Sequence, residues 1–138
     1  MPPTPIHAAN LMAAAREAHL KSYSPYSGFS VGAAVQTDAG IFAGTNVENV
    51  SFGATICAER VAIVTAIAAG ARVLLATAVV ADFPEPCPPC GVCRQVLYEF
   101  GPESQVYMFN LAGDSKVAQL SDLLPTAFEP RNLLSRSR

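Results

Sequence analysis

The sequence predicts one α/β domain, in which helices pack on the faces of a single mixed sheet. A length of 138 residues suits one domain, since single domains cluster at about 100–150 residues. Hydrophobic residues make up 51% of the chain and charged residues 14%, which supplies a core and excludes a disordered polyelectrolyte. Helical and strand patterns also alternate along the chain. We therefore expect residues 1–138 to form one domain, with a flexible tail at residues 131–138.

The first half of the chain predicts a helix, a strand hairpin and a second helix. Thr4 and Pro5 are typical of a helix start, and the apolar spacing behind them continues toward Lys21. Two β-rich runs then flank Asp38-Ala39-Gly40, which is typical of a hairpin turn. Gly70 suits the left-handed position that ends a helix. The expected segments are residues 5–21 (helix), 29–37 and 41–46 (strands) and 54–69 (helix).

The second half continues with strands and shorter helices. A continuous apolar run has the length of a buried strand. Four prolines then interrupt regular structure between Asp82 and Pro89, and a helical pattern resumes at Cys90 and stops at Gly101. The expected segments are residues 73–81 (strand), 90–100 (helix), 105–110 and 116–120 (strands) and 121–124 (helix). This order predicts a mixed sheet covered by helices.

Charge and hydropathy exclude two classes of partner. The formal net charge is −2 and the pI is about 5.6, whereas a protein that grips many phosphates carries a basic surface. No apolar stretch reaches the ~18 residues of a membrane span, and Met1–Asn10 lacks the pattern of a secretory signal. We therefore expect a cytoplasmic protein with no nucleic-acid or membrane partner. The low charge leaves an apolar surface, which favours an oligomer.

Four cysteines carry the strongest functional signal, because cysteines of a reducing compartment more often bind metal or act in catalysis than form disulfides. One lies in Cys57-Ala58-Glu59-Arg60, and three lie in two overlapping Pro-Cys-x-x-Cys motifs at residues 86–90 and 89–93. Only the second of these leads straight into a helix, whereas the first contains two prolines that remove backbone donors. We predict that Cys57, Cys90 and Cys93 bind Zn²⁺ and that Cys87 is a free thiol, with a closed four-cysteine site as the alternative.

Glu59 distinguishes a catalytic zinc site from a structural one. An open three-thiolate site needs a proton shuttle beside its water molecule, and Glu59 lies two residues from a predicted ligand. Three thiolates also give a zinc centre a net negative charge, so nearby cations are expected. Arg60 and Arg94 each directly follow a motif residue, and we expect both to donate hydrogen bonds to the sulfurs.

These residues resemble those of the zinc-dependent cytidine deaminase family, in its small homotetrameric form. The likeness covers nearly the whole chain, and the combination of segments is more specific than either cysteine motif alone. The segments are Ser24-Pro25-Tyr26-Ser27, Phe29-Ser30-Val31-Gly32-Ala33-Ala34, Asn46-Val47-Glu48-Asn49, Cys57-Ala58-Glu59-Arg60, Pro89-Cys90-Gly91-Val92-Cys93-Arg94-Gln95, and Leu123-Leu124-Pro125 with Phe128.

The resemblance implies a three-layer α/β/α sandwich with a mixed five-stranded sheet, assembled as a homotetramer whose neighbouring subunits complete each active site. It implies one zinc ion per subunit on the three predicted cysteines. It implies that Glu59 carries a proton from the zinc-bound water to the ring and then to the leaving ammonia. The substrate contacts that it implies are Asn46 and Glu48 on the ribose 3′-hydroxyl, Phe29 beside the base, the Ala58 backbone on the pyrimidine, and Phe128 in a neighbour's site.

The expected function is hydrolysis of cytidine and 2′-deoxycytidine to uridine and 2′-deoxyuridine with release of ammonia, as in pyrimidine salvage. The alternatives are deamination of a cytosine-containing aminonucleoside antibiotic such as blasticidin S, and a non-catalytic zinc module with four cysteine ligands. Asn46-Val47-Glu48-Asn49 favours a nucleoside over the antibiotic. Val50 and Phe52 stand where many relatives carry Ala and Tyr, a departure that bears on substrate fit. The preference between the two nucleosides stays open.

Overall fold

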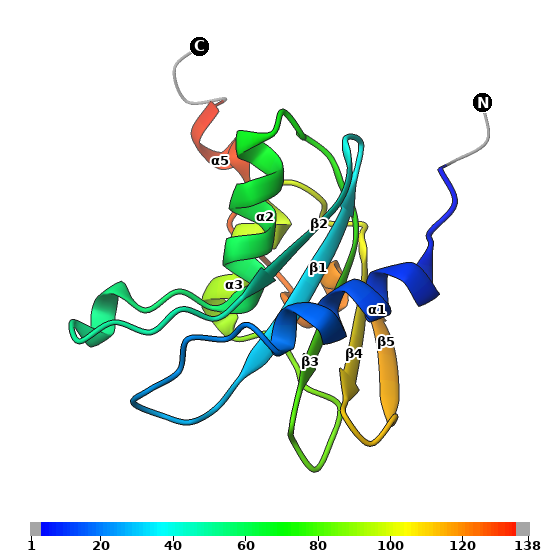
Figure 1. Cartoon of the computed structure of the whole chain (residues 1–138). Coiled ribbons are helices and arrows are strands. Elements are labelled where there is room, and N and C mark those ends of the chain that lie inside the picture. The colour runs from blue at the N-terminus through cyan, green and yellow to red at the C-terminus, as the bar shows by residue number, and fades with distance from the viewer. Residues whose placement is uncertain (1–3, 135–138) are drawn as a thin grey trace.

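Residues 4–134 are described by a computed structural model, in which a five-stranded sheet lies between two layers of helices (Figure 1). The elements are α1 (Ala8–His19), β1 (Val31–Thr37), β2 (Gly40–Thr45), the 3₁₀ helix η1 (Phe52–Ala54), α2 (Ala58–Ala68), β3 (Leu74–Ala81), α3 (Gly91–Tyr98), β4 (Gln105–Asn110), β5 (Ser115–Gln119), α4 (Leu120–Leu123) and α5 (Pro130–Leu134). The strand order is β2-β1-β3-β4-β5. β3 and β4 pair in parallel and the other neighbours pair antiparallel, so the sheet is mixed.

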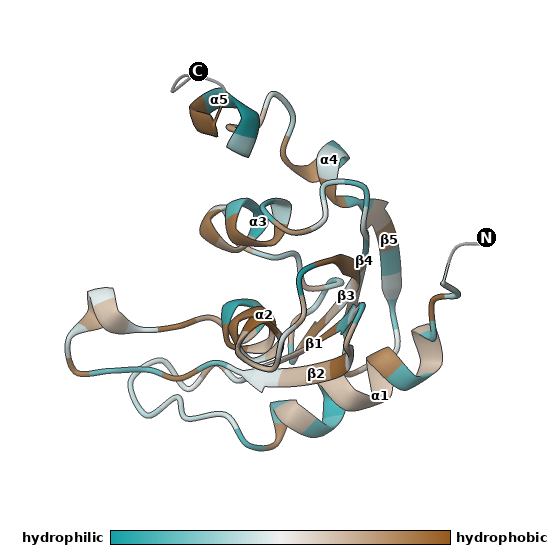
Figure 2. Ribbon diagram, turned by 90° about the horizontal axis from the view of Figure 1, so that it is seen from above, coloured by the Kyte–Doolittle hydropathy of each residue, from teal (hydrophilic) through white to brown (hydrophobic). Residues whose placement is uncertain are grey.

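The two faces of the sheet carry separate apolar cores. Figure 2 shows α1 on one face and α2 with α3 on the other. Successive strand residues point to opposite faces, so neighbouring apolar residues of one strand serve both cores. The core under α1 includes Leu11, Ala34, Val80 and Phe109, and the core under α2 and α3 includes Val35, Ile63, Val79, Leu97 and Val106. The predicted α/β/α sandwich is confirmed.

A glycine lets α2 approach the sheet closely. A Cβ atom on Gly44 of β2 would lie 2.4 Å from the Ala62 nitrogen and 2.7 Å from the Ala58 oxygen. These distances are shorter than van der Waals contact, so no larger residue fits here while α2 keeps its position. Gly44 therefore sets how closely the first turn of α2, which carries Glu59, lies against the sheet.

The first helix begins later than its sequence pattern predicts. Gln36 of β1 accepts a hydrogen bond from the His7 N–H at 2.8 Å and donates one to the Pro5 carbonyl at 2.8 Å. These two bonds hold the segment in a non-helical path across the sheet, so α1 begins at Ala8 rather than Pro5. The expected start was wrong because a distant glutamine binds the Pro5 carbonyl, which a helix from Pro5 would use to accept the Ala9 N–H.

The second helix also begins later, for a similar reason. Val47 and Ile56 pair as an isolated antiparallel β-bridge, with both N–H to carbonyl distances at 2.9 Å. The bridge keeps the chain extended up to Cys57, so α2 begins at Ala58 rather than Ala54. The loop between the two bridge residues, which contains η1, projects from the body of the molecule, as Figures 1 and 2 both show.

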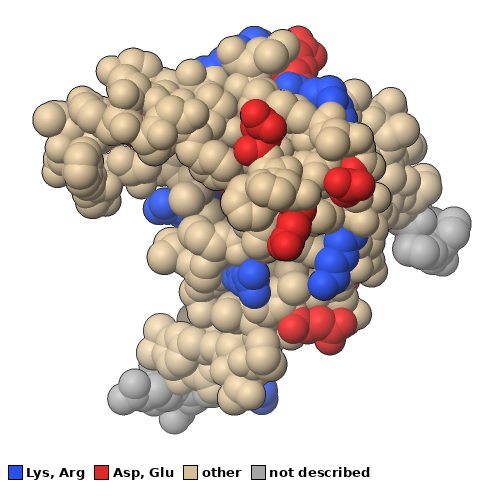
Figure 3. Space-filling model, turned by 90° about the horizontal axis from the view of Figure 1, so that it is seen from below, with Lys and Arg blue, Asp and Glu red and all other residues tan. Residues whose placement is uncertain are grey.

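The other predicted segments agree with the structure within two residues at each end. η1 and α5 were not expected, and α5 covers residues 131–134 of the expected tail, while residues 135–138 lie outside the described residues. Within residues 4–134, no helix is long and apolar enough to cross a membrane. On the face shown in Figure 3, Lys and Arg side chains lie among Asp and Glu side chains, with broad uncharged areas between them.

Candidate metal centre and active site

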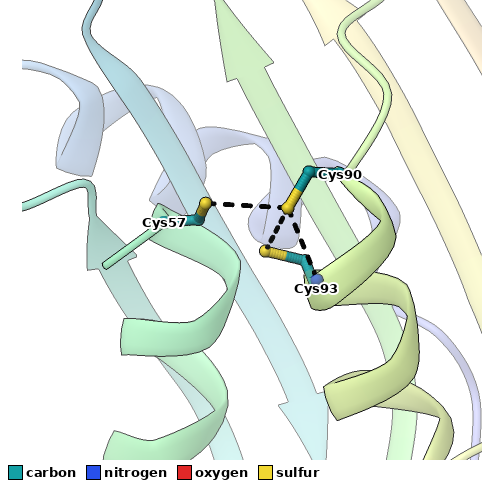
Figure 4. Close-up of side chains that lie close together, drawn as sticks. All are labelled: Cys57, Cys90 and Cys93. Carbon is teal, nitrogen blue, oxygen red and sulfur yellow. Dashed lines mark hydrogen bonds between the residues drawn. The ribbon is translucent and has the colours of Figure 1, made fainter. Parts of the chain in front are cut away.

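Three cysteine thiols converge where two helices begin (Figure 4). Cys57 is the N-cap residue of α2 and Cys90 that of α3, while Cys93 lies in the first turn of α3. The sulfurs of Cys57 and Cys90 are 3.7 Å apart, and those of Cys90 and Cys93 are 3.4 Å apart. The Cys93 N–H also donates to the Cys90 sulfur at 3.5 Å. Two helix starts on the same face of the sheet thus bring all three sulfurs to one point.

This donor set fits Zn²⁺. Sulfurs that lie about 2.3 Å from a tetrahedral zinc ion are separated by about 3.8 Å, close to the distances found here. The three sulfurs lie within 4.8 Å of one another, and they form the one such group of potential metal ligands in residues 4–134. Cys87 lies outside the group, and its thiol faces the Pro88 carbonyl at 3.8 Å. Three protein ligands leave a fourth position for water or substrate.

Cys57 is suited to bind metal as a thiolate. Its pKa is lowered to about 5, because the Cys93 thiol and the Arg60 guanidinium donate hydrogen bonds to its sulfur. The pKa of Cys93 is raised, because it donates one of these bonds and is buried. A metal ion that binds the cluster must displace the proton of Cys93, so zinc affinity depends on pH.

The two arginines beside the cluster make different contacts. Arg60 donates from Nη2 to the Cys57 sulfur at 3.5 Å and to the Thr55 carbonyl at 3.3 Å, and so offsets the charge of the thiolate. Arg94 donates to the Pro89 carbonyl at 2.8 Å and the Leu123 carbonyl at 2.9 Å. Arg94 therefore ties the segment before α3 to α4. The expected hydrogen bond from Arg94 to a sulfur is not among its contacts in the described residues.

Glu59 lies on the first turn of α2, beside the thiols. It is 4% exposed, and its carboxyl group contacts the Cys93 thiol. Burial raises the pKa of Glu59 to about 7, and repulsion by the Cys57 thiolate adds to the increase. A carboxyl group with this pKa both accepts and releases protons at neutral pH. The site thus combines a metal-binding cluster with a proton carrier.

The start of α2 also offers backbone donors. The first N–H groups of a helix have no partner within the helix. The side chain of the N-cap residue Cys57 binds none of those of α2, although the Glu59 N–H binds the carboxyl group of its own side chain. Ala58 is the first residue of this helix and is fully buried next to the cluster. An uncapped helix start suits the carbonyl group of a bound ligand.

Asn46 joins three segments near the site. Its Oδ1 accepts hydrogen bonds from the Ser22 hydroxyl at 2.6 Å and the Val31 N–H at 2.9 Å, and its Nδ2 donates to the Phe29 carbonyl at 2.8 Å. A side-chain amide has two N–H donors, so one remains for a ligand. Asn46 is buried, and its fixed amide holds the backbone of Phe29 in place.

Glu48 holds the loop before β1. Its carboxylate accepts hydrogen bonds from the N–H groups of Tyr26 at 2.9 Å and Ser27 at 3.1 Å, and from the Ser27 hydroxyl. The Ser27 hydroxyl contributes most to lowering the pKa of Glu48, so this group is ionised at neutral pH. A cavity of about 310 Å³ lies beside it and is lined by Tyr26, Ser27, Glu48, Phe52 and Thr55.

Phe29 and Phe128 lie in different parts of the molecule. Phe29 is 39% exposed, and its ring meets the ring of Phe83 edge to face. Phe128 is exposed, and Gln95 Nε2 binds its carbonyl at 3.0 Å. Phe128 lines a surface hollow with Tyr98, at the end of α3 opposite to the cysteines. The sequence analysis did not identify Phe83 as a site residue. The one signal for it was the position of an aromatic residue in the proline-rich segment before the cysteine motif.

Comparison with known proteins gives consistent results. The model of the cytidine and deoxycytidylate deaminase zinc-binding region matches residues 6–109. The chain is 46% identical to the cytidine deaminase of Halalkalibacterium halodurans over 125 aligned residues. This alignment covers 89% of this chain and 95% of the relative. It is 42% identical to the cytidine deaminase of Mycobacterium tuberculosis over 115 aligned residues, which cover 83% of this chain and 84% of the relative. The crystal structure of cytidine deaminase from Burkholderia pseudomallei is similar with a TM-score of 0.84 at 48% identity, covering 90% of this chain and 100% of that one.

Proposed function

The chain belongs to the cytidine and deoxycytidylate deaminase family, and on that basis we propose how its residues carry out the reaction. The reaction is the zinc-dependent hydrolysis of cytidine to uridine and ammonia. We extend it to 2′-deoxycytidine. The observation that carries the proposal is the buried carboxyl group of Glu59 beside three converging thiols. A structural zinc site has no use for such a group, whereas a hydrolytic one needs it.

Cys57, Cys90 and Cys93 are the proposed ligands of one zinc ion per chain. When bound, zinc supplies the activation of water that attack on C4 of the cytosine ring requires. Arg60 holds Cys57 as a thiolate through the hydrogen bond to its sulfur. Cys87 takes no part, because its thiol lies outside the cluster and burial raises its pKa to about 11.

Glu59 is the proposed proton carrier of both halves of the reaction. Its carboxylate first accepts a proton as water oxygen adds to C4, and passes that proton to N3 of the ring. It then moves the second proton of the former water to the amino group, the bond between C4 and nitrogen breaks, and ammonia leaves. A pKa of about 7 matches this double use, because each transfer needs a different protonation state of the same group.

Asn46 and Glu48 are the proposed contacts of the ribose. Asn46 has one free N–H donor, and the ionised Glu48 has free acceptor positions beyond its three bonds. Together they bind one hydroxyl group as donor and acceptor, which suits the 3′-hydroxyl. That group is common to cytidine and 2′-deoxycytidine, so this contact serves both substrates.

Phe29 and Ala58 are the proposed contacts of the base. The ring of Phe29 is exposed enough to lie against a flat pyrimidine, and its backbone is fixed by Asn46. The backbone of Ala58 reads polar groups of the pyrimidine at the uncapped start of α2. The pocket thereby recognises a cytosine ring that is presented to Glu59.

We propose a homotetramer in which Phe128 completes the site of a neighbouring subunit. The position of Phe128 at the far end of α3 supports this role, since it leaves the ring free to contact another chain. Val50 and Phe52 lie exposed on the projecting segment around η1, and exposed apolar side chains gathered in this way are typical of interfaces. We also propose that residues 1–138 act as one catalytic domain. The ligands must stay reduced thiolates, which supports a cytoplasmic location.

The alternative functions have less support. A closed four-cysteine module would need the thiol of Cys87 in the cluster, and it lies outside. Deamination of an antibiotic such as blasticidin S would not require the paired donor and acceptor that Asn46 and Glu48 offer to a hydroxyl group.

The test is ammonia release from cytidine by zinc-loaded protein, compared with the Glu59→Gln variant. Gln keeps the shape of the side chain but cannot accept a proton, so we expect kcat to fall by about 10²- to 10⁴-fold at unchanged zinc content. The matched control is Glu17→Gln, which removes an exposed carboxylate of α1 and should leave kcat unchanged. A zinc-loaded parent that releases no ammonia from cytidine or 2′-deoxycytidine contradicts the proposal.

A further inference from the structure

Two aromatic rings meet at the surface from segments that are far apart in the sequence. Phe83 lies in the proline-rich segment between β3 and α3, and Phe29 lies just before β1. Their ring centroids are 6.2 Å apart, with an angle of 71° between the planes. Neither ring belongs to the two apolar cores, and the two residues are 41% and 39% exposed. The contact is therefore not explained by packing of the sandwich.

Phe29 and the segment that carries Phe83 are both held by hydrogen bonds between side chains and the backbone. The Phe29 N–H donates to the Ser27 hydroxyl at 3.0 Å, and the Phe29 carbonyl accepts from Asn46 at 2.8 Å. The segment of Phe83 is held at the end of β4, where Asn110 Nδ2 donates to the Pro84 carbonyl at 3.3 Å. The Asn110 side chain is itself held by two hydrogen bonds with Asp114. The edge-to-face geometry thus joins two anchored segments.

The segment of Phe83 also leads directly to the metal centre. The Cys87 N–H donates to the Phe109 carbonyl at 3.4 Å, and prolines restrict the backbone on both sides of Cys87. The same stretch then reaches Cys90 at the start of α3. The backbone between Phe83 and Cys90 is therefore tied to β4 and restricted by prolines.

We propose that Phe83 is a positioning residue that holds the ring of Phe29 in the orientation that receives the pyrimidine. This inference rests on the proposed function, in which Phe29 lies beside the base. Edge-to-face contact stabilises one tilt of the Phe29 ring and leaves its remaining face open to the substrate. Without Phe83, the ring of Phe29 samples other rotamers, and part of the binding energy is used to order it.

The test is a double-mutant cycle of Phe29→Ala and Phe83→Ala with cytidine as substrate. We expect Phe83→Ala to raise KM by about 3- to 10-fold, with kcat within about 2-fold and zinc content unchanged, which is the range for one aromatic pair. In the Phe29→Ala background, Phe83→Ala should have little further effect, because its action passes through Phe29. Phe83→Tyr keeps the ring and should restore the parent KM.

Val73→Ala is the control, because it shortens an exposed apolar side chain just before β3, at the end of that strand far from Phe83, and should leave KM unchanged. An unchanged KM in Phe83→Ala, with KM raised in Phe29→Ala, overturns the positioning role alone. Effects of the two substitutions that multiply in the double variant also overturn it, since Phe83 then acts independently. An unchanged KM in Phe29→Ala refutes the proposed contact of Phe29 with the base and this inference with it.

Discussion

The metal centre and the proposed substrate-binding side of the site are built in different ways. Cys57, Glu59 and Cys93 lie at the starts of two helices, and Glu59 and Cys93 are buried. Phe29 and Phe128 lie on loops and are exposed. Helix starts that pack on a sheet hold side chains rigidly, whereas loops keep their shape only through individual hydrogen bonds. One chain therefore contains all the residues proposed for the chemistry, while its proposed binding surface stays open.

The loops are nevertheless ordered by polar side chains that are also the proposed contacts of the substrate. Asn46 binds the backbone of Phe29, and Glu48 binds the backbone of Tyr26 and Ser27. The same groups have spare hydrogen-bonding capacity for a ligand. Recognition and loop structure are thus coupled on this side, whereas at the metal centre structure comes from the helices and chemistry from the side chains that they carry.

Removal of a proposed zinc ligand should have the largest effect. A matched substitution of the nearby Cys87 shows whether that effect is specific to the metal centre. In Cys93→Ser, we expect zinc content to fall below about one tenth of the parent and deamination to be lost, because the site loses one of its three thiolates. In Cys87→Ala, we expect full zinc content and activity, with about 1 kcal/mol of lost stability from a small cavity. Elemental analysis of zinc and ammonia release measure both outcomes.

The pair of variants also decides between the open and the closed site. Cys87 has a buried thiol and lies three residues before Cys90, so it is matched to Cys93 in residue type and spacing. Loss of zinc in Cys87→Ala would show a four-cysteine site, and the proposed catalytic role of the centre would then be wrong.

The next largest effect tests whether the sheet positions the metal centre. In Gly44→Ala, the new Cβ would lie 2.4 Å from the Ala62 nitrogen, so α2 must move. We expect the free energy of unfolding to fall by about 3 kcal/mol or more, with reduced zinc binding because Cys57 moves with the helix. In the control Gly91→Ala, the new Cβ would lie within 4 Å of no atom beyond its chain neighbours and the backbone of its own helix, and stability should change by about 1 kcal/mol at most. Urea unfolding that gives equal values for both variants would contradict this account.

Much of the metal centre could be predicted from the sequence, because its signals are local. The short spacing of Cys90 and Cys93 and the helix start at their motif place these two thiols without knowledge of distant contacts. The start of α2 and the pairing of Phe29 with Phe83 could not be predicted in this way. Both depend on contacts between residues that only the folded sheet brings together.

A smaller effect concerns the pH dependence of the metal-free centre. Burial raises the pKa of Glu59 from 4.5 to about 7, so between these values the folded chain holds a proton that the unfolded chain has released. The contribution of Glu59 to stability is therefore full below pH 4.5 and is lost as the pH rises through 7, by about 3 kcal/mol in all. Gln has no charge to bury, so Glu59→Gln should lack this loss.

Urea unfolding of the chelator-treated parent and the Glu59→Gln variant at about pH 5 and pH 8 measures this difference. The variant should gain stability relative to the parent only at the higher pH. If the difference in free energy of unfolding between variant and parent is the same at both pH values, the carboxyl group of Glu59 does not carry a buried charge at the higher pH.

The smallest effect tests how the open side of the site is completed. Phe128 is 59% exposed, so Phe128→Ala should change the free energy of unfolding by less than about 0.5 kcal/mol. If its ring enters a neighbour's site, KM for cytidine should rise by about 10-fold, the range for loss of one aromatic contact. Val117→Ala, which shortens an exposed side chain of β5, is the control and should leave KM unchanged.

A mixture of two impaired variants shows whose site Phe128 serves. Phe128→Ala retains Glu59, and Glu59→Gln retains Phe128, so neither alone has a complete site. When the two are refolded together, a site that takes Glu59 from one chain and Phe128 from its neighbour has both groups, and part of the activity should return with the parent KM. If Phe128 served its own chain, every mixed site would still lack one of the two groups, and mixing would restore nothing. The mixture therefore separates a shared site from a self-contained one by whether part of the activity regains the parent KM.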